Sequence, residues 1–210
     1  VAPQAALNAT VSAAAPITAS GSFDLLAPGA TNDSSIVIGM QTGTAGAKNG
    51  TATVSFVSDA NNVGNCAPNC QLDIGTQNVS VSGNVYQVAA GQLNTAALNF
   101  GTVQVGQSVS QVLSITNSAT GAAGFVEDLN ARFGATSGTG SNLISGSGSI
   151  TNLLAGNTNS SAMTVNVNTT GAGTVNGAIA VDYFSAGAVN GVTASPGGHP
   201  LSCSQSHSCR

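Results

Sequence analysis

The sequence contains very few charged residues. Lysine and arginine together number 3 and aspartate and glutamate 7, so charged residues make up 5% of the 210-residue chain, against about 25% in an average globular domain. The three cations, Lys48, Arg132 and Arg210, lie far apart in the sequence. Because phosphate binding needs clustered cations, nucleic acid is excluded as a partner. The small net charge of −4 also leaves little repulsion between copies of the chain, which favours self-association.

Residue types that carry catalysis and metal binding are also scarce. Tryptophan is absent, and the two histidines, His199 and His207, both lie near the end of the sequence. No G-x-S-x-G elbow accompanies them, and the adjacent Glu127 and Asp128 would point to opposite faces of a strand. No acidic loop of the calcium-binding type occurs. We therefore predict a protein that is not an enzyme and needs no cofactor.

Long apolar runs are missing as well. No stretch of 18 apolar residues occurs, so no membrane span is predicted, and the sequence starts without the pattern of a signal peptide. The four cysteines form two close pairs, CAPNC and CSQSHSC, which favour an oxidising compartment. We expect a secreted or cell-surface protein whose signal has been removed.

The cysteine spacings favour disulfides over a metal site. We expect each pair to close its own loop, Cys66 with Cys70 and Cys203 with Cys209, although pairing across copies or subunits stays open. Zinc at Cys203, His207 and Cys209 is the weaker alternative, because C-x3-H-x-C is not a standard zinc spacing.

What the chain does contain is an internal repeat. Residues 20–58, SGSFDLLAPGATNDSSIVIGMQTGTAGAKNGTATVSFVS, are matched by residues 147–185, SGSITNLLAGNTNSSAMTVNVNTTGAGTVNGAIAVDYFS. Gly21 matches Gly148, and the Asn-Gly pair at 49–50 matches the pair at 176–177, an offset of 127 residues (177 minus 50). A period of this length corresponds to a whole domain. The sequence therefore predicts a partial tandem of one module.

Short alternating segments predict an all-β protein. No segment shows a helical period, whereas apolar and polar residues alternate over residues 1–13, 35–40, 51–57, 78–88 and 108–116. The Asn-Gly pair at 49–50 is typical of a hairpin turn. Many short strands with turn signals between them predict antiparallel β-sandwiches. We expect a first lobe over residues 1–88, a linker over 89–97, a second lobe over 98–191 and a cysteine-containing tail over 192–210.

The segments Leu98-Asn-Phe-Gly-Thr-Val-Gln-Val-Gly and Leu113-Ser-Ile-Thr-Asn resemble the opening strands of a known module. This is the immunoglobulin-like module of bacterial exported choice-of-anchor D proteins, which is related to ASPM-SPD-2-Hydin domains. The repeated LLA-G-x-T-N turn extends the resemblance to about Gly191. It implies immunoglobulin-like sandwiches with strands A to G, used as extracellular building blocks without a shared active site. Measured against this module, the first copy lacks strands A and B, and the second lacks the last strand, which residues 74–88 supply in the first.

Incomplete lobes would leave apolar grooves and unpaired strand edges that invite a strand from another chain. We therefore expect a structural protein that self-assembles into an extracellular filament, sheath or matrix. The donated strand is expected at the N-terminal segment, with alternating residues Val1, Pro3, Ala5, Leu7, Ala9 and Val11. The alternatives are a monomeric adhesin or carbohydrate-binding module and a fragment of a longer array. A surface glycan also stays open, because six sequons occur, at Asn8, Asn32, Asn49, Asn78, Asn159 and Asn168.

Overall fold

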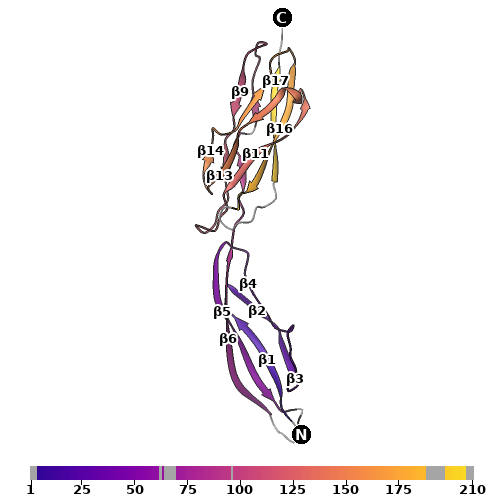
Figure 1. Cartoon of the computed structure of the whole chain (residues 1–210), viewed down its shortest axis with the longest axis vertical. Coiled ribbons are helices and arrows are strands. Elements are labelled where there is room, and N and C mark those ends of the chain that lie inside the picture. The colour runs from indigo at the N-terminus through magenta and orange to yellow at the C-terminus, as the bar shows by residue number, and fades with distance from the viewer. Residues whose placement is uncertain (1–3, 62, 64–69, 96, 188–196, 207–210) are drawn as a thin grey trace. The chain divides into compact units, whose positions relative to one another are not determined.

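The computed structural model describes residues 4–61, 63, 70–95, 97–187 and, by their backbone, 197–206 (Figure 1). Regular structure within these residues is β, apart from one short 3-10 turn, η1 (Ser141–Leu143). The predicted all-β class is therefore confirmed. The chain divides into two compact units, Val1–Val85 and Tyr86–Arg210.

The first unit contains two antiparallel sheets, one of four strands in the order β3-β1-β5-β6 and one of two strands, β2-β4. Ala52, Val54 and Phe56 alternate with threonine and serine along the long central strand, so one face of the larger sheet is apolar. The strands of this unit are β1 (Ala6–Ala13), β2 (Ile17–Ser20), β3 (Ser22–Leu26), β4 (Val37–Met40), β5 (Gly46–Asp59) and β6 (Gln71–Val85).

The second unit contains a five-stranded sheet, β13-β11-β16-β17-β8, and two three-stranded sheets, β14-β10-β7 and β12-β15-β9. The named strands pair antiparallel except β17 and β8, which are parallel. Side chains from all three sheets form one buried apolar core. The strands are β7 (Gly91–Leu93), β8 (Ala97–Asn99), β9 (Val109–Val112), β10 (Ile115–Asn117), β11 (Leu129–Thr139), β12 (Ile144–Ser147), β13 (Ser149–Leu153), β14 (Thr158–Asn159), β15 (Thr164–Val167), β16 (Thr174–Ser185) and β17 (Gly197–Ser206).

The sequence repeat is reproduced strand by strand. β2 and β4 pair with Ile17 opposite Met40, and β12 and β15 pair with Ile144 opposite Val167, at the same offset of 127 residues. β1 pairs with β3 as β11 pairs with β13, and both pairs carry a register shift at the same place, after Leu7 and after Leu129. The strands β1 to β6 therefore correspond, in order, to β11, β12, β13, β15, β16 and β17.

One sharp bend is built identically in the two units. Gly21 (φ 98°) separates β2 from β3, and Gly148 (φ 86°) separates β12 from β13. A Cβ atom at Gly21 would lie 1.8 Å from the carbonyl oxygen of Ser35, and one at Gly148 would lie 1.9 Å from that of Ala162. Only glycine tolerates both the left-handed conformation and this approach. The repeated glycine therefore allows the chain to pass between strands of different sheets.

Asparagine side chains shape the following turns in the same way. The Oδ1 atom of Asn32 accepts the N–H of Ser35 (3.0 Å), and that of Asn159 accepts the N–H of Ala162 (2.9 Å). Such bonds let an asparagine side chain take the place of a backbone partner in a turn. The repeat thus preserves its turn chemistry.

The hairpin predicted at residues 49–50 does not occur. These residues lie inside β5, and Gly50 is paired with Val81 of β6. A Cβ atom on Gly50 would lie 2.7 Å from Cγ1 of Ile17, and one on Gly177 would lie 2.6 Å from the carbonyl oxygen of Ser137. Glycine is required at both positions for close packing, which is the other common role of a glycine within a strand pattern.

The predictions for the linker and the tail also need correction. Residues 91–93 form β7, which pairs with β10, so the predicted linker contributes a strand to the second unit. Residues 197–206 form β17, which pairs along β16 and supplies the last strand that the second lobe was expected to lack. This segment, GGHPLSCSQS, has little apolar alternation, and its partner is the long edge of β16. The sequence Val79-Ser-Val-Ser in β6 corresponds to Leu201-Ser-Cys-Ser in β17.

The bend at Gly148 gives a stability prediction. We expect Gly148→Ala to lower the free energy of unfolding of the second unit by about 3 kcal/mol, because a left-handed alanine is strained and its Cβ meets a carbonyl oxygen. Gly156→Ala is the matched control, since Gly156 (φ 79°) has open space around it and should cost about 1 kcal/mol. Urea unfolding, with hydrogen exchange of β12 and β13 to locate the loss, measures both. Equal losses would contradict the close approach.

Candidate functional site

The described residues offer no cluster of metal-ligating side chains. Among them, no group of three or more histidine, cysteine, aspartate or glutamate side chains is placed to hold a metal ion. Within the same residues, no helix is long and apolar enough to cross a membrane.

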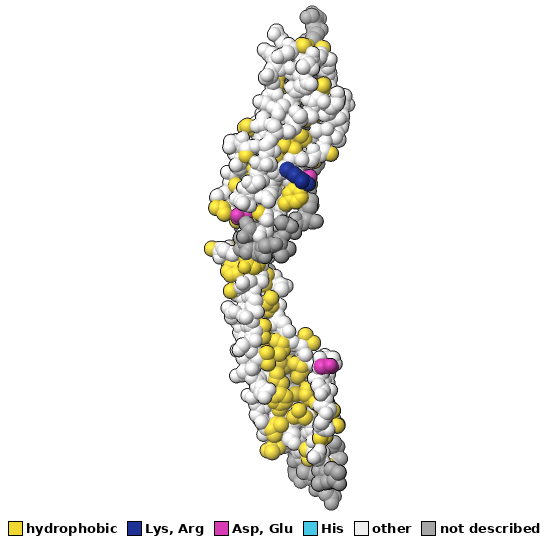
Figure 2. Space-filling model, in the orientation of Figure 1, with side chains coloured by type: hydrophobic (Ala, Val, Ile, Leu, Met, Phe, Trp, Pro, Cys, Tyr) yellow, Lys and Arg dark blue, Asp and Glu magenta, His cyan; other side chains and the backbone are white. Residues whose placement is uncertain are grey.

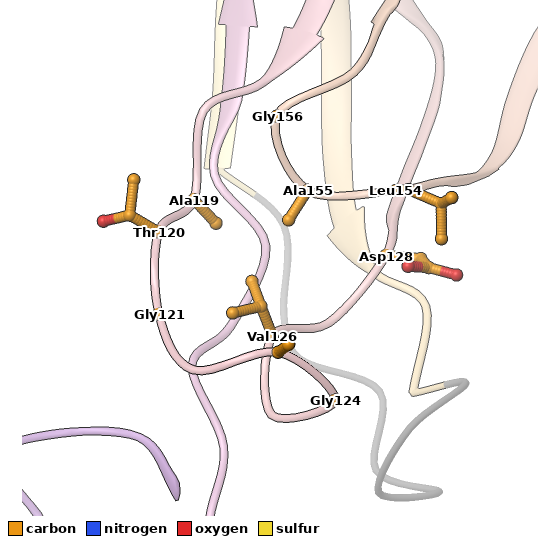
Figure 3. A pocket seen from close by; sticks show the side chains of 10 residues that line it. Ala119, Thr120, Gly121, Gly124, Val126, Asp128, Leu154, Ala155 and Gly156 are labelled. Atoms are coloured by element: carbon orange, nitrogen blue, oxygen red, sulfur yellow. The ribbon is translucent and has the colours of Figure 1, made fainter.

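A hollow in the second unit is chemically poor. It has a volume of about 600 Å3 and lies between the loop that follows β10 and the turn that follows β13 (Figure 3). Figure 3 shows Thr120 and Asp128 on opposite sides of this hollow. The remaining lining residues are glycines and aliphatic side chains. One hydroxyl and one distant carboxylate do not make a nucleophile and base pair.

One face of the larger sheet in the first unit exposes apolar side chains. Residues opposite each other on antiparallel strands point to the same face. In β6, Val79 is opposite the fully buried Ala52, and Leu72 is opposite Ser58, which lies on the same side of β5 as Ala52. Val79 is nevertheless 41% exposed, and Leu72 is 67% exposed. We call this surface the open face; it comprises Leu7, Phe23, Ile36, Ile38, Met40, Phe56, Leu72 and Val79.

The second unit shows how the open face would look if it were covered. Six apolar positions are half-buried in the first unit, whereas their counterparts are 6% exposed or less. These pairs are defined by strand correspondence, so each side chain is compared with the one that occupies the same position in the other unit. The pairs are Leu7 with Leu129, Phe23 with Ile150, Ile36 with Met163, Ile38 with Val165, Met40 with Val167, and Phe56 with Tyr183.

One segment accounts for the difference. Residues 97–117, which we call the covering segment, place β8 beside β17 and β9 beside β15. Its large side chains at Leu98, Phe100, Leu113 and Ile115 are 8% exposed or less and belong to the core of the second unit. The described residues of the first unit contain no counterpart of this segment.

The strand edges beside the open face are therefore unoccupied within the described residues. There β6 pairs only with β5, and β4 pairs only with β2. Ten consecutive residues of β6, from Gln71 to Ser80, are exposed, and Asp73 is the one charged residue of this strand. Figure 2 shows a strip of hydrophobic side chains along this unit. A hollow of about 280 Å3 at one end is lined by Leu7, Leu26 and Ile74, among others.

A single cation lies within the first unit. Lys48 is 7% exposed, and its Nζ atom donates a hydrogen bond to Oγ1 of Thr44 (2.9 Å). Its counterpart in β16 is Val175, which is fully buried. The aliphatic stem of Lys48 therefore fills a position that is apolar in the second unit.

A carboxylate joins three strands at the other end of β5. The side chain of Asp59 accepts hydrogen bonds from Nδ2 of Asn8 in β1 (2.8 Å), from Nε2 of Gln71 in β6 (2.8 Å) and from the backbone N–H of Asn61 (2.9 Å). The bond from the Asn61 backbone, followed by that from Gln71, lowers the pKa of Asp59 below its usual value. This network fixes the register of β1, β5 and β6 beside the open face.

The predicted donor residues lie elsewhere than expected. Leu7, Ala9 and Val11 belong to β1, which is paired with β3 on one side and β5 on the other. Both edges of this segment are therefore used within its own unit, and Ala5 directly precedes it. Val1 and Pro3 lie outside the described residues.

The cysteine pairings remain predictions. Cys70 is buried and its carbonyl oxygen accepts the N–H of Ala60 (2.9 Å), whereas Cys66 lies outside the described residues. The backbone of Cys203 pairs with Gly177 in β16 and with Leu98 in β8. Cys209 lies outside the described residues, and so does His207 of the zinc alternative.

The sequons occupy different settings. Asn8, Asn32 and Asn159 use their side-chain amides in the hydrogen bonds described above, and Asn78 accepts a bond from Oγ1 of Thr53 (3.0 Å). Asn49 and Asn168 are exposed. Glycosylation remains a prediction at these sites.

In comparisons with known proteins, no family model matches the chain and no curated protein matches its sequence. The resemblance to the choice-of-anchor D module therefore stays a prediction. The incomplete first lobe and the donated strand also stay predictions, and the N-terminal segment named as the donor forms β1, which pairs with β3 and β5. The signal that could have located β17 is its Val-Ser-Val-Ser counterpart in β6.

The Asp59 network predicts a pH-dependent stability. Because the pKa of Asp59 is lowered by folding, its contribution is present above the unfolded value of about 3.9 and is lost as the pH falls through the folded value. We expect Asp59→Asn to lower the melting temperature at pH 7 and to weaken its dependence on pH below about 4. Thermal unfolding from pH 2 to 7 tests this, with the exposed Asp33→Asn as control. A variant whose melting temperature falls with pH as steeply as that of the unmodified protein would contradict the role of this carboxylate.

Proposed function

We propose that the protein is a secreted structural protein that assembles with further subunits into an extracellular filament, sheath or matrix. The observation that carries this proposal is the open face. Six of its apolar side chains are partly exposed, whereas their counterparts in the second unit are buried. In this proposal both units are immunoglobulin-like β-sandwiches, and a strand from a neighbouring subunit completes the first one.

Two further observations support assembly through this surface. Unpaired strand edges readily accept a strand from another chain unless charges, prolines or bulges block them. β6 contains no proline, one charged residue and a bulge near Gly75. The stretch from Thr76 to Val85, beyond this bulge, therefore has no charge, proline or bulge that would hinder strand pairing. The low charge of the whole chain also weakens repulsion between subunits.

The proposed function predicts different effects for neighbouring residues of β6. Val79 lies on the open face, whereas the exposed Thr76 is opposite Ser55 and points to the other side of the sheet. We expect Val79→Lys to abolish assembly, since a charge would have to be buried in the joint, and Thr76→Lys to leave assembly intact.

Negative-stain electron microscopy and sedimentation velocity measure this difference. Val79 is partly exposed in the subunit, so the variant should keep its β-sheet circular dichroism. Dispersed single molecules of the unmodified protein at every concentration would rule out the proposed function. Equal loss of assembly in both variants would show that the joint does not involve the open face.

A further inference from the structure

We propose that the open face is an acceptor site for one kind of occupant, an uncharged extended segment of another polypeptide that carries the pattern of residues 97–117. This inference deepens the proposed function by naming the donated strand and its register. It is argued from the second unit, where the same strands hold such a segment in place.

The strand correspondence fixes where the donor would pair. In the second unit Ala97, Leu98 and Asn99 run parallel to β17 opposite Ser202, Cys203 and Ser204. Ile179 of β16 corresponds to Ala52 of β5, so their partners Leu201 and Val79 also correspond. The next three residues of β17 therefore correspond to Ser80, Val81 and Ser82 of β6. The donor would therefore run parallel to β6 along Ser80–Ser82.

A second contact follows from the other sheet. β9 pairs antiparallel to β15, with Val109 opposite Val167 and Val112 opposite Thr164. The corresponding positions on β4 are Met40 and Val37, and the donor would pair there with the edge of β4 that does not pair with β2. One donor could thus bridge the edges of both sheets in the first unit, as residues 97–117 do in the second.

The chemistry of the site selects the donor. The open face presents aliphatic and aromatic side chains, so the donor needs large apolar side chains two residues apart, as Leu98 and Phe100 are. A carboxylate or ammonium group at those positions would be buried without a partner. Within the described residues the one segment with this role is already used by the second unit. The proposal therefore assigns the occupant to another polypeptide.

A peptide added to the full chain tests this proposal. The peptide comprises residues 97–117, with a photoreactive phenylalanine derivative replacing Phe100. Binding is measured on dispersed protein, and mass spectrometry locates the crosslinks. We expect crosslinks in β6 or at residues 36–40, and inhibition of assembly. We also expect binding about tenfold weaker with Val79→Lys, but not with Thr76→Lys, which lies on the other side of β6 and outside Ser80–Ser82. A control peptide with Leu98→Ser and Phe100→Ser should not bind, and this control leaves the protein unaltered.

The outcomes separate this inference from the proposed function. Polymers that form normally, together with a peptide that fails to bind or that crosslinks only to the second unit, would overturn the acceptor site and leave the structural function standing. Crosslinks in the first unit without polymers under any condition would support the acceptor site and reject the structural function. Absence of both would reject both.

Discussion

An apolar sheet face has to be covered, and the two units of this protein meet that requirement to different extents. In the second unit the covering segment buries Leu98, Phe100, Leu113 and Ile115 against the neighbouring sheets. In the first unit the same kind of face remains half-exposed. Complete burial of one large apolar side chain stabilises a fold by about 1.5–3 kcal/mol. Half-burial at six positions therefore leaves several kcal/mol available to a partner, before the entropy of association is subtracted.

Local turn chemistry does not depend on this covering. Gly21 and Gly148 form the same bend, and Asn32 and Asn159 accept the same backbone bonds, although only one of the two units has a fully buried core. The turns are set by backbone conformation and short-range hydrogen bonds, which the sequence repeat preserves. The difference between the units therefore arises from long-range packing alone.

The contrast between local turns and long-range packing explains what could be predicted from the sequence. The repeat and the alternating runs predicted the all-β class, because a period of two is a local property. Gly50 was assigned to a turn, since sequence alone does not show that Ile17 packs against it. β17 was assigned to a tail because its conformation depends on pairing with β16 more than on its own pattern. The strand at β1 is predicted correctly but assigned to another subunit, because its pairing with β5 is long-range and leaves no local pattern.

The backbone ladder of the first unit is formed without a covering segment on the open face, the surface that we propose accepts a donor. β5 pairs with β6 from Gly46 opposite Val85 to Asp59 opposite Gln71, and Asp59 ties both strands to Asn8 of β1. These hydrogen bonds are present in the single chain, where the open face is not covered. In the proposed assembly, a donor would therefore add apolar burial to strands that are already paired. Since a preformed site loses less conformational entropy on binding than one that must fold, this arrangement suits the proposed joint between subunits.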